Sequence, residues 1–193
     1  MLVRGRRAAL GLLAGGTLVG GLSPRPARAQ NAIGKLVEEG PKPLPAITLT
    51  DPEGRERDLS SIVGPGAGKG IVLNLWATWC APCVEEMPAL DRLATLLAKE
   101  GILVIPASSD RGGRAQVDPF FARTGIQHLG PWLDPRSAAT RALGARGLPT
   151  TILIDPQGRE RARLEGGAAW DSAELVADVR RLCGTPKPGT EPT

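Results

Sequence analysis

Two apolar runs, at 71–76 and 102–107, stand out in the pattern of hydrophobic and polar positions along the chain. Runs of this length are typical of central strands that are buried on both faces. Between them, apolar side chains recur at steps of three and four residues, which predicts an amphipathic helix that ends near Gly101. Pro88 lies inside this helix and removes one backbone donor, so we expect a kink there. The pattern predicts a β-α-β unit, whose helix carries the apolar positions Val84, Met87, Leu90, Leu93, Leu96 and Leu97.

The second half of the chain predicts a β-hairpin and a last helix. The hairpin spans 151–164, with proline and glycine at the turn positions of 155–158. Asp171 or Ser172 can cap the final helix, which Gly184 closes. A β-α-β unit followed by two strands and a helix favours an α/β fold with a central mixed sheet and helices on both faces. Weaker patterns indicate helices at 117–124 and 136–143 and an extended segment at 131–133.

An additional hairpin is predicted near the N-terminus of the folded part. Strands at 46–50 and 55–59 flank a turn that contains proline and glycine. Before it, residues 30–43 have modest helical character followed by prolines, which is typical of a connector. The glycine-rich stretch at 64–70 predicts a flexible loop, since its Gly-Lys pair lacks the other residues of a phosphate-binding loop.

The first 29 residues predict export from the cytoplasm. They hold five arginines and no acidic residue, which leaves 19 basic and 20 acidic side chains for the rest of the chain. An apolar stretch at 8–22 and the small residues Ala27 and Ala29 form a signal peptide with cleavage before Gln30. Adjacent arginines at 6 and 7 suggest twin-arginine export, and an uncleaved membrane anchor is the alternative. The predicted order is a signal peptide at 1–29, a linker at 30–43, a folded domain at 44–183 and a disordered tail at 184–193.

The most informative chemistry lies in Cys80 and Cys83, which are separated by two residues where the strand at 71–76 gives way to the helix. A helix N-terminus offers unpaired amide donors and a partial positive charge, which stabilise a thiolate and lower its pKa. We therefore expect Cys80 to be an exposed nucleophile and Cys83, one turn into the helix, to be a buried resolving thiol. This pattern favours a redox pair.

Two other uses of a cysteine pair have less support. A structural zinc site needs a second pair of ligands, and the remaining candidates are the isolated His128 and Cys183. A structural disulfide across so small a loop would restrict the unfolded chain little. We expect His128 to lie on the surface and Cys183 to be a buried, inert thiol, although an odd cysteine in an exported protein can also pair between chains. No metal and no cofactor are predicted.

The residues around the pair carry a family resemblance. The sequence Trp-Ala-Thr-Trp-Cys-Ala-Pro-Cys at 76–83, followed by Glu-Glu-Met-Pro, and the sequence Gly-Leu-Pro-Thr-Thr-Ile-Leu-Ile-Asp at 147–155 resemble the thioredoxin superfamily. More narrowly, residues 44–183 resemble its exported TlpA-like branch, which includes ResA-type and CcmG-type reductases. The segments 110–113 and 166–170 bring the likeness closest to TlpA. The resemblance implies a thioredoxin-like fold, with a central mixed sheet flanked by helices and an added N-terminal β-hairpin.

The resemblance also implies a substrate-binding surface beside the cysteines. Pro149 matches the cis-proline that faces the cysteine pair in thioredoxin folds. There the proline exposes the backbone of the preceding residue, here Leu148, to an extended substrate strand and denies metals access to the sulfurs. Thr150 follows in the same motif, and Trp79 beside Cys80 can line the substrate surface.

Glu86 is the predicted acid-base residue. It follows Cys83 by three positions and shares its helix face, whereas Glu85 points away. A partly buried carboxylate there could move a proton to or from Cys83, and similar reductases carry an acid at this place. Cytoplasmic thioredoxin has a buried aspartate six residues before its first cysteine, but this chain has Asn74 there. The acid-base role is therefore expected to rest on Glu86.

These features predict a periplasmic thiol:disulfide oxidoreductase that reduces cysteine-containing client proteins. The TlpA likeness implies clients in cytochrome c or cytochrome oxidase copper-site maturation, and a membrane thiol electron donor to reduce the pair again. We expect a monomer. No nucleic-acid partner is predicted, because the positive charge lies in the first 29 residues. Two alternatives stay open. Copper metallochaperones space their cysteines three apart, and thiol peroxidases place threonine where Ala77 stands.

Overall fold

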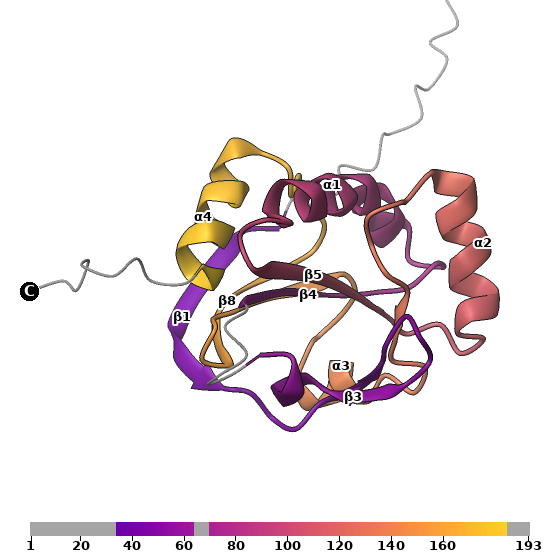
Figure 1. The fold of residues 1–193 in the computed structure, drawn as a ribbon, viewed down its shortest axis with the longest axis horizontal. Helices are drawn as coiled ribbons and strands as arrows, with labels where there is room; N and C mark the ends of the chain where they lie inside the picture. Colours follow the sequence, from indigo (N-terminus) through magenta and orange to yellow (C-terminus); the bar gives the residue numbers. More distant parts are fainter. Residues whose placement is uncertain (1–33, 64–69, 185–193) are drawn as a thin grey trace, which may run out of the picture. The chain divides into compact units, whose positions relative to one another are not determined.

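The computed structural model of the chain describes residues 34–63 and 70–184 (Figure 1). These residues contain an eight-stranded sheet in the order β1-β8-β7-β4-β5-β6-β2-β3. The predicted signal peptide, the loop at 64–69 and the tail beyond Gly184 lie outside the described residues. The strands are β1 (Leu36–Pro43), β2 (Thr48–Thr50), β3 (Glu56–Asp58), β4 (Gly70–Trp76), β5 (Ile102–Ser108), β6 (Trp132–Leu133), β7 (Thr150–Ile154) and β8 (Arg159–Glu165).

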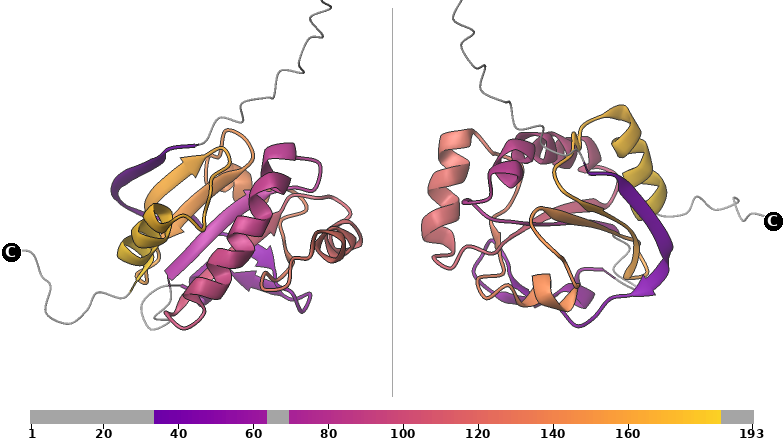
Figure 2. Two further views of the ribbon diagram at one scale, coloured as in Figure 1. Left: turned by 90° about the horizontal axis from the view of Figure 1, so that it is seen from above. Right: turned by 180° about the vertical axis from the view of Figure 1, so that it is seen from behind.

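The sheet is mixed and lies between two layers of helices. β4 and β5 are parallel neighbours connected through α1, as the β-α-β pattern predicts. β7 runs antiparallel to both β4 and β8, which confirms the predicted hairpin. One apolar core joins the sheet to α1, α2 and α4, and a second joins its other face to α3 and the 3-10 helix η1 (Figure 2). The helices are η1 (Leu59–Ser61), α1 (Ala81–Leu97), α2 (Arg114–Thr124), α3 (Ala138–Ala142) and α4 (Ala173–Cys183).

Strand β4 is buried along its whole length, because the sheet continues on both sides and helices cover both faces. Trp76, its last residue, is fully buried and lies 5.8 Å from the Phe121 ring and 5.2 Å from the Phe120 ring, measured between centroids. Aromatic pairs at such distances stabilise a core beyond the area they bury. The strand that leads to the cysteines therefore ends in a buried aromatic cluster.

Strand β1 corrects the predicted linker. Residues 36–43 have no helical character and pair antiparallel with β8, with a register shift between Glu38 and Lys42. Strand β7 pairs with only one edge of β8. The backbone N–H and C=O groups along the other edge of β8 need hydrogen-bond partners, and β1 supplies them. Proline is tolerated in such an outer strand, since its missing N–H would face away from the sheet. The prolines of this segment indicated its extended geometry. They did not indicate that the segment pairs with β8, which lies far along the chain.

The N-terminal hairpin is present and extends the opposite edge of the sheet. β2 and β3 pair antiparallel, and Thr50 of β2 pairs with Leu133 of β6. Helix α4 is capped by the Ser172 side chain and ends at Gly184, as predicted. Helix α3 is shorter than the predicted helix at 136–143. No helix within 34–63 or 70–184 is long and apolar enough to cross a membrane.

The contact between the start of β4 and the end of α4 leaves no space for a side chain at Gly70. A Cβ atom there would lie 1.9 Å from the carbonyl oxygen of Cys183. We predict that Gly70→Ala lowers the free energy of unfolding by about 1–3 kcal/mol, because backbone atoms must move to relieve the overlap. Gly40→Ala is the control, since its Cβ would meet nothing within 4 Å, and it should change stability by less than about 0.5 kcal/mol. Equal stability of the two variants in chemical denaturation would contradict this packing.

Candidate active site around Cys80 and Cys83

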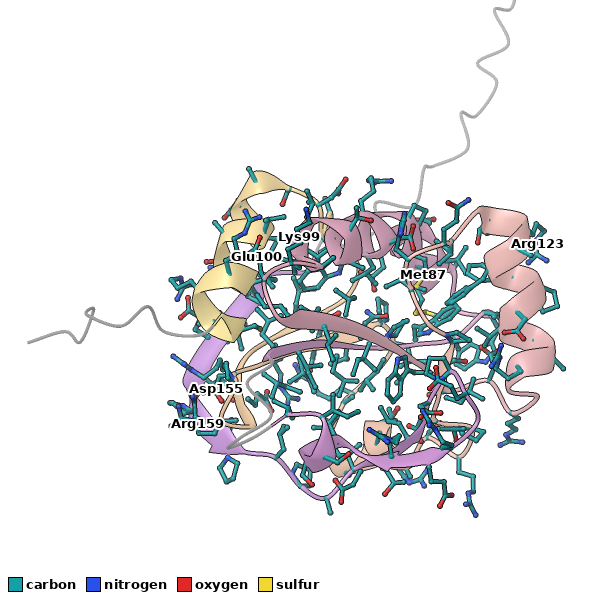
Figure 3. All side chains as sticks on the ribbon, viewed as in Figure 1. Met87, Lys99, Glu100, Arg123, Asp155 and Arg159 are labelled. Atoms are coloured by element: carbon teal, nitrogen blue, oxygen red, sulfur yellow. A yellow bond between two sulfur atoms is a disulfide. The ribbon has the colours of Figure 1, made fainter. Side chains whose placement is uncertain are left out.

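The two cysteines lie at the junction between β4 and α1. Cys80 is the N-cap residue of α1, and Cys83 lies in its first turn. The pair forms a disulfide, with the Cα atoms 5.3 Å apart. Figure 3 shows this sulfur–sulfur bond near Met87, which lies one turn further along the helix. No side chain caps the helix, so its first amide groups remain available to a sulfur at this end.

The two sulfurs differ in their access to solvent. Cys80 is 7 % exposed, whereas Cys83 is fully buried in the apolar core that joins the sheet to α1, α2 and α4. Trp79, directly before Cys80, is 68 % exposed, which is unusual for so large an apolar side chain. Cys80 is less buried than Cys83, but the prediction of an exposed Cys80 is wrong, because the start of α1 packs its side chain into the same core. The structure thus leaves an apolar ring on the surface next to Cys80 in the sequence.

The segment 147–150 lies at the same end of the sheet as the cysteine pair. Thr150 begins β7 and pairs with Leu75 of β4, two residues from the turn that carries Cys80. The Leu148–Pro149 peptide bond is cis, as predicted. Leu148 is partly buried and packs against the core that contains both cysteines. The carbonyl of Pro149 accepts a hydrogen bond from Gly166 N–H at 2.9 Å, which ties this segment to the loop between β8 and α4.

Glu86 lies buried on the cysteine side of α1, with 4 % of its surface exposed. Its Oε2 accepts hydrogen bonds from Ala168 N–H at 3.0 Å and from Trp170 Nε1–H at 2.9 Å. Its Oε1 accepts a bond from Asn74 Nδ2 at 2.8 Å. Three donors from strand β4 and the β8–α4 loop thus converge on one carboxyl group. The sequence predicted a partly buried acid here but gave no sign of these partners.

Burial dominates the protonation of this group. It raises the pKa of Glu86 to about 7, although the bonds from Trp170, Ala168 and Asn74 act in the opposite direction because they favour the ionised form. A carboxyl group with this pKa exchanges its proton near neutral pH, where an acid-base residue is most useful. The chemistry expected of Glu86 is therefore compatible with its surroundings.

Asn74, which stands where cytoplasmic thioredoxin has an aspartate, belongs to the hydrogen-bond network of Glu86. It is fully buried, and its Nδ2 group also donates to Thr151 Oγ1 at 2.9 Å. Its Oδ1 atom is buried and has no hydrogen-bond partner among the described residues. Rotation of the amide would exchange donor and acceptor, so Asn74 can serve either protonation state of Glu86. The sequence showed the missing acid but not this role.

An open groove of about 320 Å³ runs beside Glu86, between α1 and the β8–α4 loop. Gly167 lines the groove, and a Cβ there would make ordinary van der Waals contacts, 3.4 Å from the Pro82 carbonyl oxygen and 3.8 Å from Glu86 Oε2. Arg92 and Asp171 form an ion pair at 2.7 Å at the groove. The groove gives solvent a short route to the buried carboxyl group.

The two remaining candidates lie away from this site. Cys183 is fully buried at the end of α4, and its Sγ lies 3.6 Å from the carbonyl oxygen of Ile71. Burial raises the pKa of the Cys183 thiol to about 12, so the thiolate needed for disulfide exchange is scarce. His128 is exposed, and its backbone N–H donates to Asp91. These positions agree with the predicted inert thiol and surface histidine.

The chain resembles known redox proteins in sequence. It matches the Redoxin family over residues 39–178, which is most of its length. It is 34% identical to the thiol-disulfide oxidoreductase ResA of Geobacillus thermodenitrificans over 122 residues, covering 63% of this chain and 67% of that protein. It is 33% identical to ResA of Geobacillus kaustophilus over 130 residues, covering 67% of this chain and 71% of that protein. The Redoxin match spans both the cysteine motif and the Leu148–Pro149 segment.

Solved structures share the fold at lower sequence identity. A crystal structure described as a candidate thiol:disulfide interchange protein DsbE from Chlorobium tepidum has a TM-score of 0.64 and 23% identity, covering 77% of this chain and all of that one. A secreted thiol-disulfide isomerase from Corynebacterium glutamicum has a TM-score of 0.60 and 23% identity, covering 75% and 90%. The chain therefore belongs to the Redoxin family, as a TlpA/ResA-like member of the thioredoxin superfamily with disulfide oxidoreductase activity.

Proposed function

We propose that this thiol-disulfide oxidoreductase works in the periplasm as a reductant of disulfides in client proteins. The observation that carries the proposal is a bonded pair of sulfurs, the first slightly exposed and the second fully buried, on the same helix turn as a buried carboxyl group. A client disulfide that approaches this end of α1 meets Cys80 first, while Cys83 remains shielded in the core. This asymmetry gives each group a separate task in disulfide exchange.

In the proposed reaction, the Cys80 thiolate attacks one sulfur of the client disulfide. The client's sulfur–sulfur bond breaks, its second sulfur leaves as a thiolate, and a mixed disulfide joins Cys80 to the client. Cys83 then attacks the Cys80 sulfur and releases the reduced client. Two electrons pass to the client, whose two sulfurs take up two protons, and the Cys80–Cys83 disulfide forms. The described disulfide corresponds to the end of this cycle.

Glu86 is proposed to accept the proton that Cys83 must lose before it can attack. Cys83 is fully buried, so water does not reach it directly, and Glu86 lies on the same face of α1. With a pKa of about 7, the carboxyl group can take this proton and later release it to solvent through the adjacent groove. Its bonds to Asn74 and Trp170 hold it in place during both steps.

Client binding is proposed to use the surface formed by Trp79 and residues 148–150. Within the described parts of the chain, the backbone N–H and C=O of Leu148 have no hydrogen-bond partner. Free backbone groups at an edge can pair with an extended peptide, which gives affinity without demanding a particular sequence. The exposed Trp79 ring adds apolar contact beside the cysteine.

The cellular role is proposed from the signal-peptide pattern and the TlpA likeness. A reductant in the oxidising periplasm needs a membrane thiol electron donor that returns two electrons to the Cys80–Cys83 disulfide. The likeness to TlpA-type reductases supports clients with paired cysteines in cytochrome c or cytochrome oxidase copper-site maturation. The basic segment at 1–29 supports export, with cleavage before Gln30.

Substitution of each cysteine separates the two steps of the reaction. Cys80→Ser should abolish disulfide reduction, because the attacking sulfur is lost. Cys83→Ser should accumulate a mixed disulfide with the client, since nothing resolves it. Non-reducing gel electrophoresis and mass spectrometry distinguish these species. Retained reductase activity in the Cys80→Ser variant would contradict the proposed role.

Glu86→Gln should change how stability depends on pH. The usual pKa of the carboxyl group is 4.5, and folding raises it to about 7, so the protonated form is favoured in the folded protein. The stability from Glu86 is therefore complete below pH 4.5 and is lost as pH rises to about 7. Over this range the stability of Glu86→Gln relative to the parent should rise by about 3 kcal/mol in the disulfide form. Denaturation at a series of pH values measures this difference.

A second variant tests the raised pKa of Glu86 by changing one of its hydrogen-bond donors. Trp170→Phe removes a donor that favours the ionised carboxylate, so it should move the loss of stability to higher pH. An unchanged pH profile in both variants would contradict a buried, titrating Glu86.

Export makes a direct prediction about the mature chain. Protein recovered from the periplasmic fraction should have a mass that starts at Gln30, because cleavage is predicted after Ala29. A full-length protein in the membrane fraction would instead support the anchor.

A further inference from the structure

Asp110 is a buried carboxylate that the proposed reaction does not use. It follows β5, is fully buried, and has no salt-bridge partner within the described segments of the chain. An isolated buried charge is costly unless several hydrogen bonds stabilise it. The hydrogen-bond partners of Asp110 should therefore indicate the role of its carboxylate.

These partners lie in the loop that leads to the cysteine pair. Asp110 Oδ1 accepts a bond from Thr78 Oγ1 at 2.7 Å, and Oδ2 accepts one from Thr78 N–H at 2.9 Å. Oδ2 also accepts a bond from Ser108 Oγ at 2.7 Å. Every partner is a neutral donor, so the network holds the carboxylate in place and leaves its negative charge uncompensated.

The carboxylate is attached to the turn that carries the nucleophile. Thr78 precedes Cys80 by two residues, so their Cα atoms are at most about 7.6 Å apart. Cys80 N–H donates to the Ala77 carbonyl at 3.1 Å, which closes the turn between them. The Asp110 carboxylate is bonded to this same turn, and a negative charge near a thiol in a poorly solvated site disfavours the thiolate. The same bonds fix the turn that presents Trp79 and Cys80.

We propose that Asp110 is a positioning residue that fixes the Cys80 turn and keeps the cysteine pair reducing by opposing formation of the Cys80 thiolate. This inference rests on the proposed function of Cys80 as the attacking thiol. A stabilised thiolate stabilises the reduced pair and makes a protein of this kind a stronger oxidant. The Asp110 charge acts in the opposite direction, so it favours donation of electrons to a client.

Other charged groups around the pair act beside Asp110. Glu85 and Glu86 lie on α1 after Cys83, and Arg111 is exposed next to Asp110. The N-terminus of α1 favours the thiolate and therefore opposes the carboxylates. Because these groups are unchanged in an Asp110 variant, a difference from the parent protein isolates the contribution of Asp110.

Asp110→Asn removes the charge and can preserve the network. The amide oxygen can accept from Thr78 N–H and Ser108 Oγ, while the amide nitrogen can donate to Thr78 Oγ1, whose hydroxyl can reverse its role. The measurement is equilibration with glutathione. Two glutathione thiols are oxidised to one glutathione disulfide, and the Cys80–Cys83 bond is reduced to two thiols by the two electrons and two protons transferred.

The expected result is a roughly tenfold shift of this equilibrium towards the reduced pair in Asp110→Asn, which corresponds to a potential about 30 mV more oxidising. The pKa of Cys80, followed by the pH dependence of its alkylation, should fall in parallel. A variant whose equilibrium and Cys80 pKa both equal those of the parent protein would overturn the inference. If the parent protein itself does not equilibrate with glutathione, the proposed function fails instead.

Two controls separate charge from structure. Asp134→Asn is closely matched, because Asp134 is also buried and accepts bonds from the backbone of Ala138 and from the backbone and hydroxyl of Thr140. It should leave the equilibrium within about twofold of the parent, and a shift as large as that of Asp110→Asn would overturn the inference.

Ser108→Ala gives a test that does not depend on the folding of Asp110→Asn. It keeps the carboxylate and removes one of its donors. The inference requires that this variant be no more oxidising than the parent protein. A shift to the oxidising side would show that the intact network matters and the charge does not.

Discussion

The hydrogen-bonded burial of Glu86 is the interaction on which the site depends. One carboxyl group receives Asn74 from β4 and the Ala168 and Trp170 donors from the β8–α4 loop, so it joins segments that are far apart in the sequence. Loss of any donor would leave a buried polar group unpaired, at a cost of about 1–3 kcal/mol. The loop is thereby held against α1, where it also contacts the Pro149 segment through Gly166.

This arrangement gives the two cysteines of a common fold different surroundings, and disulfide exchange depends on that difference. The sheet buries β4 completely, and its rigid end presents Cys80 at the N-terminus of α1 while keeping Cys83 inside. A buried acid with a pKa near 7 follows the pair along α1, and Asp110 is bonded to Thr78 in the turn before it. The cysteine motif provides the chemistry, and these two carboxyl groups are proposed to adjust it.

The parts of the fold with local signals were predictable from the sequence. The β4–α1–β5 unit follows from apolar periodicity, and the β7–β8 hairpin from its turn residues. The cysteine pair, the cis bond before Pro149 and the burial of Glu86 followed from motif position. Strand β1 did not, because its pairing with β8 depends on a partner far along the chain. For the same reason, the donors to Glu86 and the bonds of Asp110 could not be predicted from the sequence. Hydrogen bonds between distant segments leave no periodic pattern in it.

The central claim is that this oxidoreductase donates electrons to its clients. The most direct test is the reduction potential of the Cys80–Cys83 pair, measured by equilibration with glutathione. Related pairs range from about −270 mV in thioredoxin to about −120 mV in the strong oxidant DsbA. The account predicts a value nearer the thioredoxin end of this range. A value near −120 mV would contradict it, because the pair would then accept electrons from its clients.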